Sequence, residues 1–135
     1  MAEFIFNVIP IIAGTIGAMV VGALWYSPHL FGEEWAHLIG IKMKDMKGMD
    51  MSMMIIPGVS ALLMSTILYN FITWSGGVTL PNALIVAFLV WIGFIATALF
   101  VNNSFAGRPK KLWYIDAGHY LIALLVMGAA IGLLG

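Results

Sequence analysis

Charged side chains are absent from two long stretches of this chain. The first lies between Glu3 and Glu33, and the second lies between Asp50 and Arg108. A helix that spans a bilayer needs about 20 predominantly apolar residues in succession. Both stretches are long enough for this, whereas a soluble domain would expose much of that apolar surface to water. The pattern therefore predicts a membrane protein.

Four segments reach membrane length, and they lack the two-residue alternation of a transmembrane β-barrel. An all-α fold follows: a single four-helix transmembrane domain over residues 1–135, with the helices packed as a bundle. Thr79 and Pro81 predict the start of the third helix as its cap and first turn. The expected spans run from Phe4 to Tyr26, Ser52 to Trp74, Pro81 to Asn102 and Leu112 to Leu134.

Composition agrees with a lipid environment and narrows the partners. The chain is 62% hydrophobic and 9% charged, against about 25% charged residues in an average soluble protein. A formal net charge of zero argues against a nucleic-acid partner, and the lack of cysteine excludes disulfides. We expect no cleaved signal peptide, because Glu3 stands where a basic n-region would lie.

The basic residues predict the orientation of the helices. All six lie in two connections, residues 42–47 between spans one and two and residues 108–111 between spans three and four. Cytoplasmic loops carry an excess of Lys and Arg, so both connections are expected in the cytoplasm and both termini outside.

Small residues predict close helix packing. Gly14, Ala18 and Gly22 recur at intervals of four along span one, and Gly128 with Gly132 forms a G-x-x-x-G pair on span four. Such residues let helix backbones approach closely in lipid. They fit packing within one chain or between chains. Four short helices enclose little volume, so we expect a homo-oligomer around any pore.

Polar side chains gather at one end of the predicted bundle. They follow spans one and three and occupy the first turns of span four, so they should converge at one level of the membrane. The opposite end has little beyond Asn7, Asn70, Asn82 and a few hydroxyls. We therefore expect a vestibule for a ligand or ion at the cytoplasmic side. Its candidate residues are Tyr26, Ser27, Asn102, Asn103, Arg108, Asp116 and His119.

Asp116 and His119 are the most informative members of this set. They are three residues apart on one helix face, and His119 lies roughly 10 Å in from Leu112. Ionisable side chains at such depth usually mark a proton, ion or ligand site. A structural interpretation stays open: Asp116 would pair with Arg108 or Lys111, and His119 would hydrogen-bond to Asp116 or to a tyrosine.

Two metal sites are conceivable. Glu34 and His37 form a Glu-x-x-His pair that, with Asp116 and His119, resembles half of a dimetal centre. Spans two and three supply no further carboxylate, so a solvated amphipathic helix is the simpler interpretation.

Six methionines crowd residues 43–54, and thioethers suit Cu(I). Helical spacing favours instead a short interfacial helix between spans one and two. Pro57 should then bend or restart the helix. The copper candidates within this Met-rich loop are Met43, Met46 and Met49.

Several motifs together resemble a known family. They are residues 22–28 (GALWYSP), Phe31 to Trp35, residues 101–109 (VNNSFAGRP), residues 116–120 (DAGHY) and residues 126–129 (VMGA). In this order they are similar to the bacterial and fungal family of small membrane proteins called domain of unknown function seventeen sixty-one. The resemblance implies a multi-pass, four-helix protein of the plasma membrane, the inner membrane in bacteria, and it brings no activity.

Three functions compete. The first is an oligomeric transporter or channel for a small solute, an ion or a proton. The second is a non-catalytic membrane subunit or assembly factor that binds a protein partner or lipid through the Met-rich loop. An enzyme is the least favoured, because the sequence shows no recognised nucleophile, phosphate loop or zinc motif. No cofactor can be named from the sequence.

Overall fold

The computed structural model describes residues 3–42 and 51–135, and this part of the chain is helical without a β-strand. Four of its helices are long and apolar enough to cross a membrane, which confirms the predicted all-α fold. These helices are apolar on all sides, as expected when one side meets lipid and the other meets protein. In chain order the elements are α1 (Val8–Trp25), α2 (Gly32–Ile39), α3 (Met51–Trp74), α4 (Leu80–Val90), η2 (Trp91–Ala96), α5 (Thr97–Phe105) and α6 (Lys110–Leu134).

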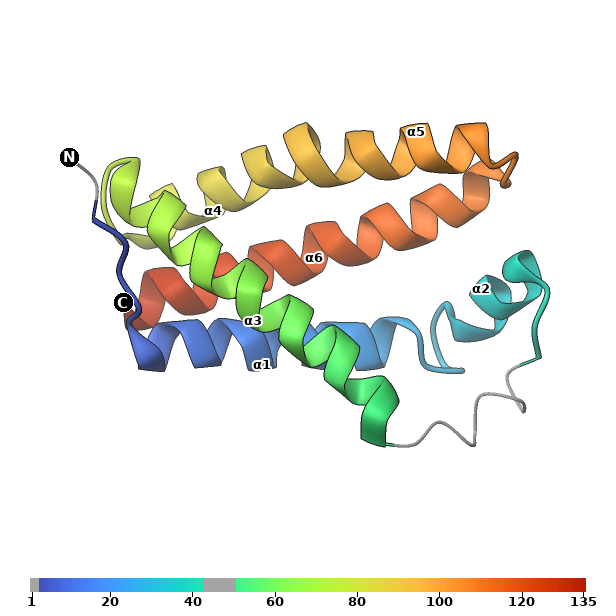
Figure 1. The fold of residues 1–135 in the computed structure, drawn as a ribbon, viewed down its shortest axis with the longest axis horizontal. Coiled ribbons are helices and arrows are strands. Elements are labelled where there is room, and N and C mark those ends of the chain that lie inside the picture. The colour runs from blue at the N-terminus through green and yellow to red at the C-terminus, as the bar shows by residue number, and fades with distance from the viewer. Residues whose placement is uncertain (1–2, 43–50) are drawn as a thin grey trace.

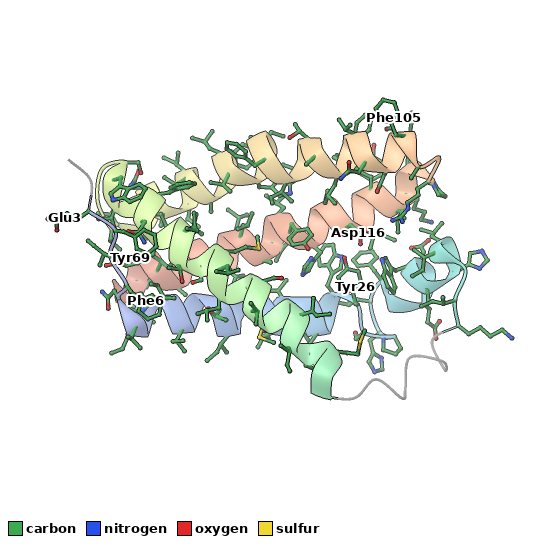
Figure 2. The ribbon with its side chains drawn as sticks, in the orientation of Figure 1. Glu3, Phe6, Tyr26, Tyr69, Phe105 and Asp116 are labelled. Atoms are coloured by element: carbon green, nitrogen blue, oxygen red, sulfur yellow. The ribbon has the colours of Figure 1, made fainter. Side chains whose placement is uncertain are left out.

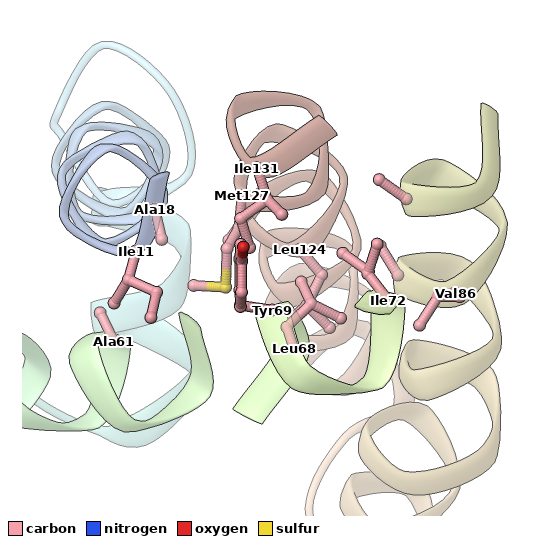
Figure 3. Packing of buried hydrophobic residues seen from close by; sticks show 13 residues of the cluster. Ile11, Ala18, Ala61, Leu68, Tyr69, Ile72, Val86, Leu124, Met127 and Ile131 are labelled. Carbon is pink, nitrogen blue, oxygen red and sulfur yellow. The ribbon is translucent and has the colours of Figure 1, made fainter. Parts of the chain in front are cut away.

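Helix α6 occupies the centre of the bundle. It packs along α1 on one side and along α4 on the other, while α3 crosses α1 obliquely (Figure 1). The contact between these helices is apolar and well buried, as Figure 3 shows from close by. Large side chains at its centre are Ile11, Leu68, Ile72, Leu124, Met127 and Ile131.

The first span is shorter than the sequence predicted. The helix was expected from Phe4, but it begins at Val8 and the preceding residues are extended. The Asn70 amide explains the difference. It accepts a hydrogen bond from the Ile5 backbone N–H at 2.7 Å and donates to the Ile5 carbonyl at 2.8 Å. Both backbone groups of Ile5 are therefore bonded outside a helix.

The third span is a composite of α4, η2 and α5 that runs from Leu80 to Phe105. Its predicted start is confirmed, since the Thr79 hydroxyl accepts from the Asn82 N–H at 3.4 Å and proline follows in the first turn. The middle segment η2 is a π-helix. The Trp113 indole donates to the Ala96 carbonyl of this segment at 2.9 Å, which ties it to α6.

Helix α3 continues through Pro57 without interruption. The predicted restart of the helix near this proline is therefore wrong. The interfacial helix predicted for the Met-rich stretch falls mainly on residues 43–50, which lie outside the described residues.

The predicted packing ridges lie at contacts within the single chain. A Cβ built on Gly14 would stand 2.6 Å from the Ser65 hydroxyl oxygen of α3. A Cβ on Gly132 would stand 2.8 Å from the Leu80 Cα at the start of α4. Ala18 is buried in the core, Gly22 faces α6, and Gly128 lies against α4. The tertiary structure thus places these small residues where helices of one chain meet.

Both chain termini lie at one end of the bundle, and α2 and the α5–α6 turn lie at the other (Figure 1). An ion pair between Lys111 and Glu34 joins α6 to α2 at this second end. The described parts of the two basic connections therefore share one end of the bundle. This is expected, because two spans separate these connections along the chain. We call this the loop end, and the opposite one the terminal end.

Candidate functional site

The site begins where α1 ends against the first turns of α6. The Tyr26 hydroxyl donates to the Asp116 carboxylate oxygen Oδ1 at 2.6 Å, and these two side chains face each other in Figure 2. The neighbouring Trp25 indole donates to the Ile115 carbonyl at 2.9 Å. Tyr26 caps α1 because Pro28 follows closely and disfavours helical geometry before it. Two adjacent aromatic residues thus fix the end of α1 on α6.

His119 lies one helical turn beyond Asp116. Its ring centroid is 5.1 Å from that of Tyr26 and 4.7 Å from that of Tyr120. A Cβ built on Gly22 would stand 3.3 Å from the His119 Nε2 atom, which is a tight contact, so a glycine here leaves this nitrogen more space on the α1 side. The His119 Nδ1 atom is buried and has no hydrogen-bond partner in the described part of the chain. Buried polar atoms are normally paired, so this one calls for an explanation.

The structural interpretation of Asp116 needs a correction. Within the described residues Asp116 forms no ion pair, and Lys111 pairs with Glu34 of α2 instead. Arg108 is exposed. The carboxylate accepts a hydrogen bond from the Tyr26 hydroxyl at the end of α1. The partner of Asp116 is thus a neutral hydroxyl rather than a cation.

A pocket of about 440 Å³ opens beside His119, between α1, α3 and α6. Its volume lies within the range of about 300 to 1,000 Å³ that is usual for small-molecule sites. Apolar side chains form most of its wall, and hydroxyl and imidazole groups gather at the His119 end. Its lining residues include Met19, Gly22, Tyr26, Ser60, His119 and Tyr120.

The other predicted vestibule residues lie elsewhere. The Ser27 hydroxyl donates to the Leu24 carbonyl and so stabilises the turn in which it lies. Asn102 and Arg108 are exposed. Asn103 is buried, and its Nδ2 atom lacks a partner in the described part of the chain. The structure therefore brings Tyr26, Asp116 and His119 together and leaves these four apart from them.

The metal candidates do not meet. Glu34 is paired with Lys111, and His37 is exposed. Among residues 3–42 and 51–135 no three His, Asp or Glu side chains come close enough to hold a metal ion. The copper candidates Met43, Met46 and Met49 lie outside the described residues.

Sequence reasoning missed the apolar part of the site. Met19, Met54, Met64 and Met127 line the pocket from three different helices, and no local motif connects them. Tyr120 was also missed, although its position beside His119 was a signal. These residues meet only because α1, α3 and α6 do.

Comparison with known proteins settles the family. Residues 9–132 match the model of the family described as "Protein of unknown function (DUF1761)". The chain belongs to this family. No curated protein and no solved structure matches it. Membership confirms the predicted resemblance and agrees with a multi-pass membrane protein, but it names no activity.

Proposed function

We propose that this protein is a non-enzymatic transporter or channel of the plasma membrane, assembled as a homo-oligomer, for a small solute, an ion or a proton. The pocket between α1, α3 and α6 would be its binding site, at the cytoplasmic side of the membrane. The observation that supports the proposal is the pocket of about 440 Å³ with an imidazole at its edge whose Nδ1 atom lacks a hydrogen-bond partner in the described residues. A polar side chain of a membrane helix that lies beside a pocket and lacks a hydrogen-bond partner is an expected feature of a ligand or proton site.

The arrangement suits reversible binding. His119 can donate or accept a hydrogen bond, and the Tyr26 hydroxyl keeps acceptor capacity after donating to Asp116. In a site shielded from water such hydrogen bonds are stronger than at the surface. A solute that enters the pocket would therefore find partners at one end and apolar contacts elsewhere.

The way onward to the terminal end is closed within one chain. Ile11, Ser65 and Met127 are fully buried where α1, α3 and α6 meet, and the Ser65 hydroxyl donates to the Ile11 carbonyl at 2.8 Å. Passage would need these helices to move apart, or a path between chains. This need is our reason for keeping a homo-oligomer in the proposal.

The proposed orientation can be tested directly because the chain has no cysteine of its own. In cells, Lys42→Cys and Lys110→Cys should resist a membrane-impermeant thiol reagent until the membrane is permeabilised. Glu3→Cys should react from outside. Labelling of positions 42 and 110 from opposite sides would contradict the four-span arrangement.

Transport is tested with the purified protein in liposomes. We expect flux of protons, ions or small metabolites above that of empty liposomes, and its loss in Asp116→Asn and His119→Ala. Ser104→Ala is the matched control, because this polar residue is exposed at the same end of the bundle. No flux for any solute would refute the proposal. Unchanged flux in both site variants would refute the assignment of the site.

A membrane subunit is the second candidate, and one observation favours it. The helix from Leu80 to Phe105 turns large aromatic side chains outward, with Phe94 70% and Phe105 91% exposed. Such a surface fits a neighbouring helix as well as lipid. Purification in mild detergent should then recover a second protein in fixed ratio. Recovery of the single polypeptide at every expression level would count against this function.

A further inference from the structure

We propose that the solute held in this pocket is an uncharged amphiphile: a hydrocarbon chain that carries a single hydrogen-bond acceptor head, such as an ester or ketone carbonyl. The inference rests on the proposed function only in taking the pocket as the solute site.

The walls select an apolar chain. Four methionines, Met19, Met54, Met64 and Met127, line the pocket together with alanine, leucine, isoleucine and proline side chains. Methionine is flexible and polarisable, so a methionine-rich wall adapts to a hydrocarbon of irregular shape. Hydrated ions and sugars would lose their water against such a wall without gaining partners.

The size selects a molecule of modest length. A volume of about 440 Å³ holds roughly fifteen groups of the size of a water molecule, at about 30 Å³ each. Along α1 the lining residues extend from Ala18 to Tyr26, which is roughly 12 Å at 1.5 Å per residue. The space thus fits a molecule of about fifteen heavy atoms whose chain is bent.

The lack of charge in the lining selects an uncharged head. None of the described residues that line the pocket is Asp, Glu, Lys or Arg. Lys111 is paired with Glu34, and neither Lys111 nor Arg108 lines the pocket. An anionic head would also meet the nearby Asp116 carboxylate. Burying a charge without a counter-charge is costly, which disfavours fatty acids and amines alike.

His119 selects an acceptor. In its neutral form an imidazole has one N–H and one lone pair. Since Nδ1 is buried without a partner in the described chain, the proton is better placed on Nε2, because an unpaired buried donor is costly. Nε2 is the His119 atom nearest to Gly22, and both residues line the pocket. A carbonyl oxygen of the ligand beside Gly22 would accept this N–H.

Part of the pocket wall lies on the exposed, apolar surface of α3. Met54 and Ile56 of α3 line the pocket, are exposed, and lie within the segment Met53–Trp74 that is apolar enough to span a bilayer. A ligand that already resides among acyl chains can therefore enter sideways past α3. An amphiphile partitions there, whereas a hydrophilic solute does not.

Methyl laurate is a suitable probe, with an uncharged ester head and fifteen heavy atoms. Radiolabelled methyl laurate is equilibrated with the full chain in nanodiscs, and binding to empty nanodiscs is subtracted. We expect saturable binding at one site per chain. Laurate at pH 8, which has the same chain but a charged head, and dodecane, which has no head, should each bind at least tenfold more weakly. Absence of saturable binding, or equal binding of laurate, would overturn the inference.

Variants locate the site. Gly22→Ala places a methyl group beside His119 Nε2 and should weaken binding at least tenfold. Gly93→Ala is the matched control, because nothing lies within 4 Å of a Cβ there, and it should bind as the native chain does. Thermal unfolding checks that both variants are folded. Equal affinity of Gly22→Ala and the native chain would overturn the assignment.

A second pair of variants tests the hydrogen bond. His119→Leu should lose about tenfold in affinity, the worth of one hydrogen bond. His119→Gln keeps an N–H donor and should recover part of the loss. No difference between these two variants would remove the acceptor head from the proposal.

The ligand class and the transport proposal can be refuted separately. Saturable methyl laurate binding without flux of any solute would refute the transport proposal and leave the ligand class standing. Flux of a hydrophilic solute that depends on Asp116, without methyl laurate binding, would refute the ligand class and leave the transport proposal standing.

Discussion

The two ends of the bundle treat their buried polar groups differently. At the terminal end the Asn70 side chain is 0% exposed and makes three hydrogen bonds, two with Ile5 and one with the Thr66 carbonyl. Asn7 donates to the Tyr69 hydroxyl, and Asn82 donates to the Ile72 and Gly77 carbonyls and to a serine hydroxyl. The amides at this end are thus tied into the fold.

In the half of the bundle nearer the loop end, the hydrogen bonding of buried side chains is less complete. Two buried side-chain atoms there, His119 Nδ1 and Asn103 Nδ2, lack a partner in the described residues. The pocket opens beside His119, close to the first turns of α3. Polar residues in this protein thus have two uses. Those at the terminal end hold helices together, whereas those near the pocket include an imidazole whose Nδ1 atom has no partner in the described residues.

Removal of the Asn70 amide should have the largest effect on stability. Asn70→Ala deletes three hydrogen bonds and leaves both backbone groups of Ile5 unpaired. We expect the free energy of unfolding in detergent to fall by about 2 to 3 kcal/mol. Ser104→Ala, an exposed site, should stay within about 0.5 kcal/mol of the native chain. Equal stability of the two variants would show that the amide does not hold the terminal end.

Gly132→Ala should come next. The added methyl would meet the Leu80 backbone at 2.8 Å, which cannot move aside as a side chain can. We expect a loss of about 1 to 2 kcal/mol in the free energy of unfolding, after the gain in helix propensity. Gly93→Ala should lose nothing. A change of oligomer mass in light scattering without loss of stability would instead place Gly132 between chains.

Tyr26→Phe should have a smaller effect. It removes the hydroxyl that donates to Asp116 but keeps the ring and its contacts. We expect a loss of about 1 kcal/mol in the free energy of unfolding. Tyr114→Phe is the control, since Tyr114 is 66% exposed. A loss as large as that of Asn70→Ala would mean that both ends are equally structural.

His119→Leu should have the smallest effect on stability, with the opposite sign. Replacing an incompletely paired polar group by an apolar one of similar size can stabilise a buried site, here by up to about 0.5 kcal/mol. Flux and methyl laurate binding should fall together in the same variant, because function is often held at some expense of stability. His29→Leu, at an exposed histidine, should change none of these. A clear loss of stability in His119→Leu would make the imidazole structural.

The sequence predicted the spans well and the site only in part. Hydrophobicity alone located four helices, because each must be apolar along its whole length wherever its neighbours lie. The start of α1 was missed, since it depends on Asn70, 65 residues away from Ile5. Asp116 and His119 were found because charge and depth are local properties of one helix. Their partners Tyr26 and Gly22 belong to another helix, and only the packing of α1 on α6 decides which atoms meet.

The sequence by itself therefore determined that this chain is helical, that it crosses the membrane four times, and that its basic connections share one side. These properties follow from residue type and order, because an apolar helix partitions into lipid whatever its tertiary contacts are. The tertiary structure decided that the glycine ridges pack within one chain, that Asp116 bonds to Tyr26 rather than to a cation, and that methionines from three helices enclose a pocket. Such contacts join residues distant in sequence, and only the angles at which the helices cross bring them together.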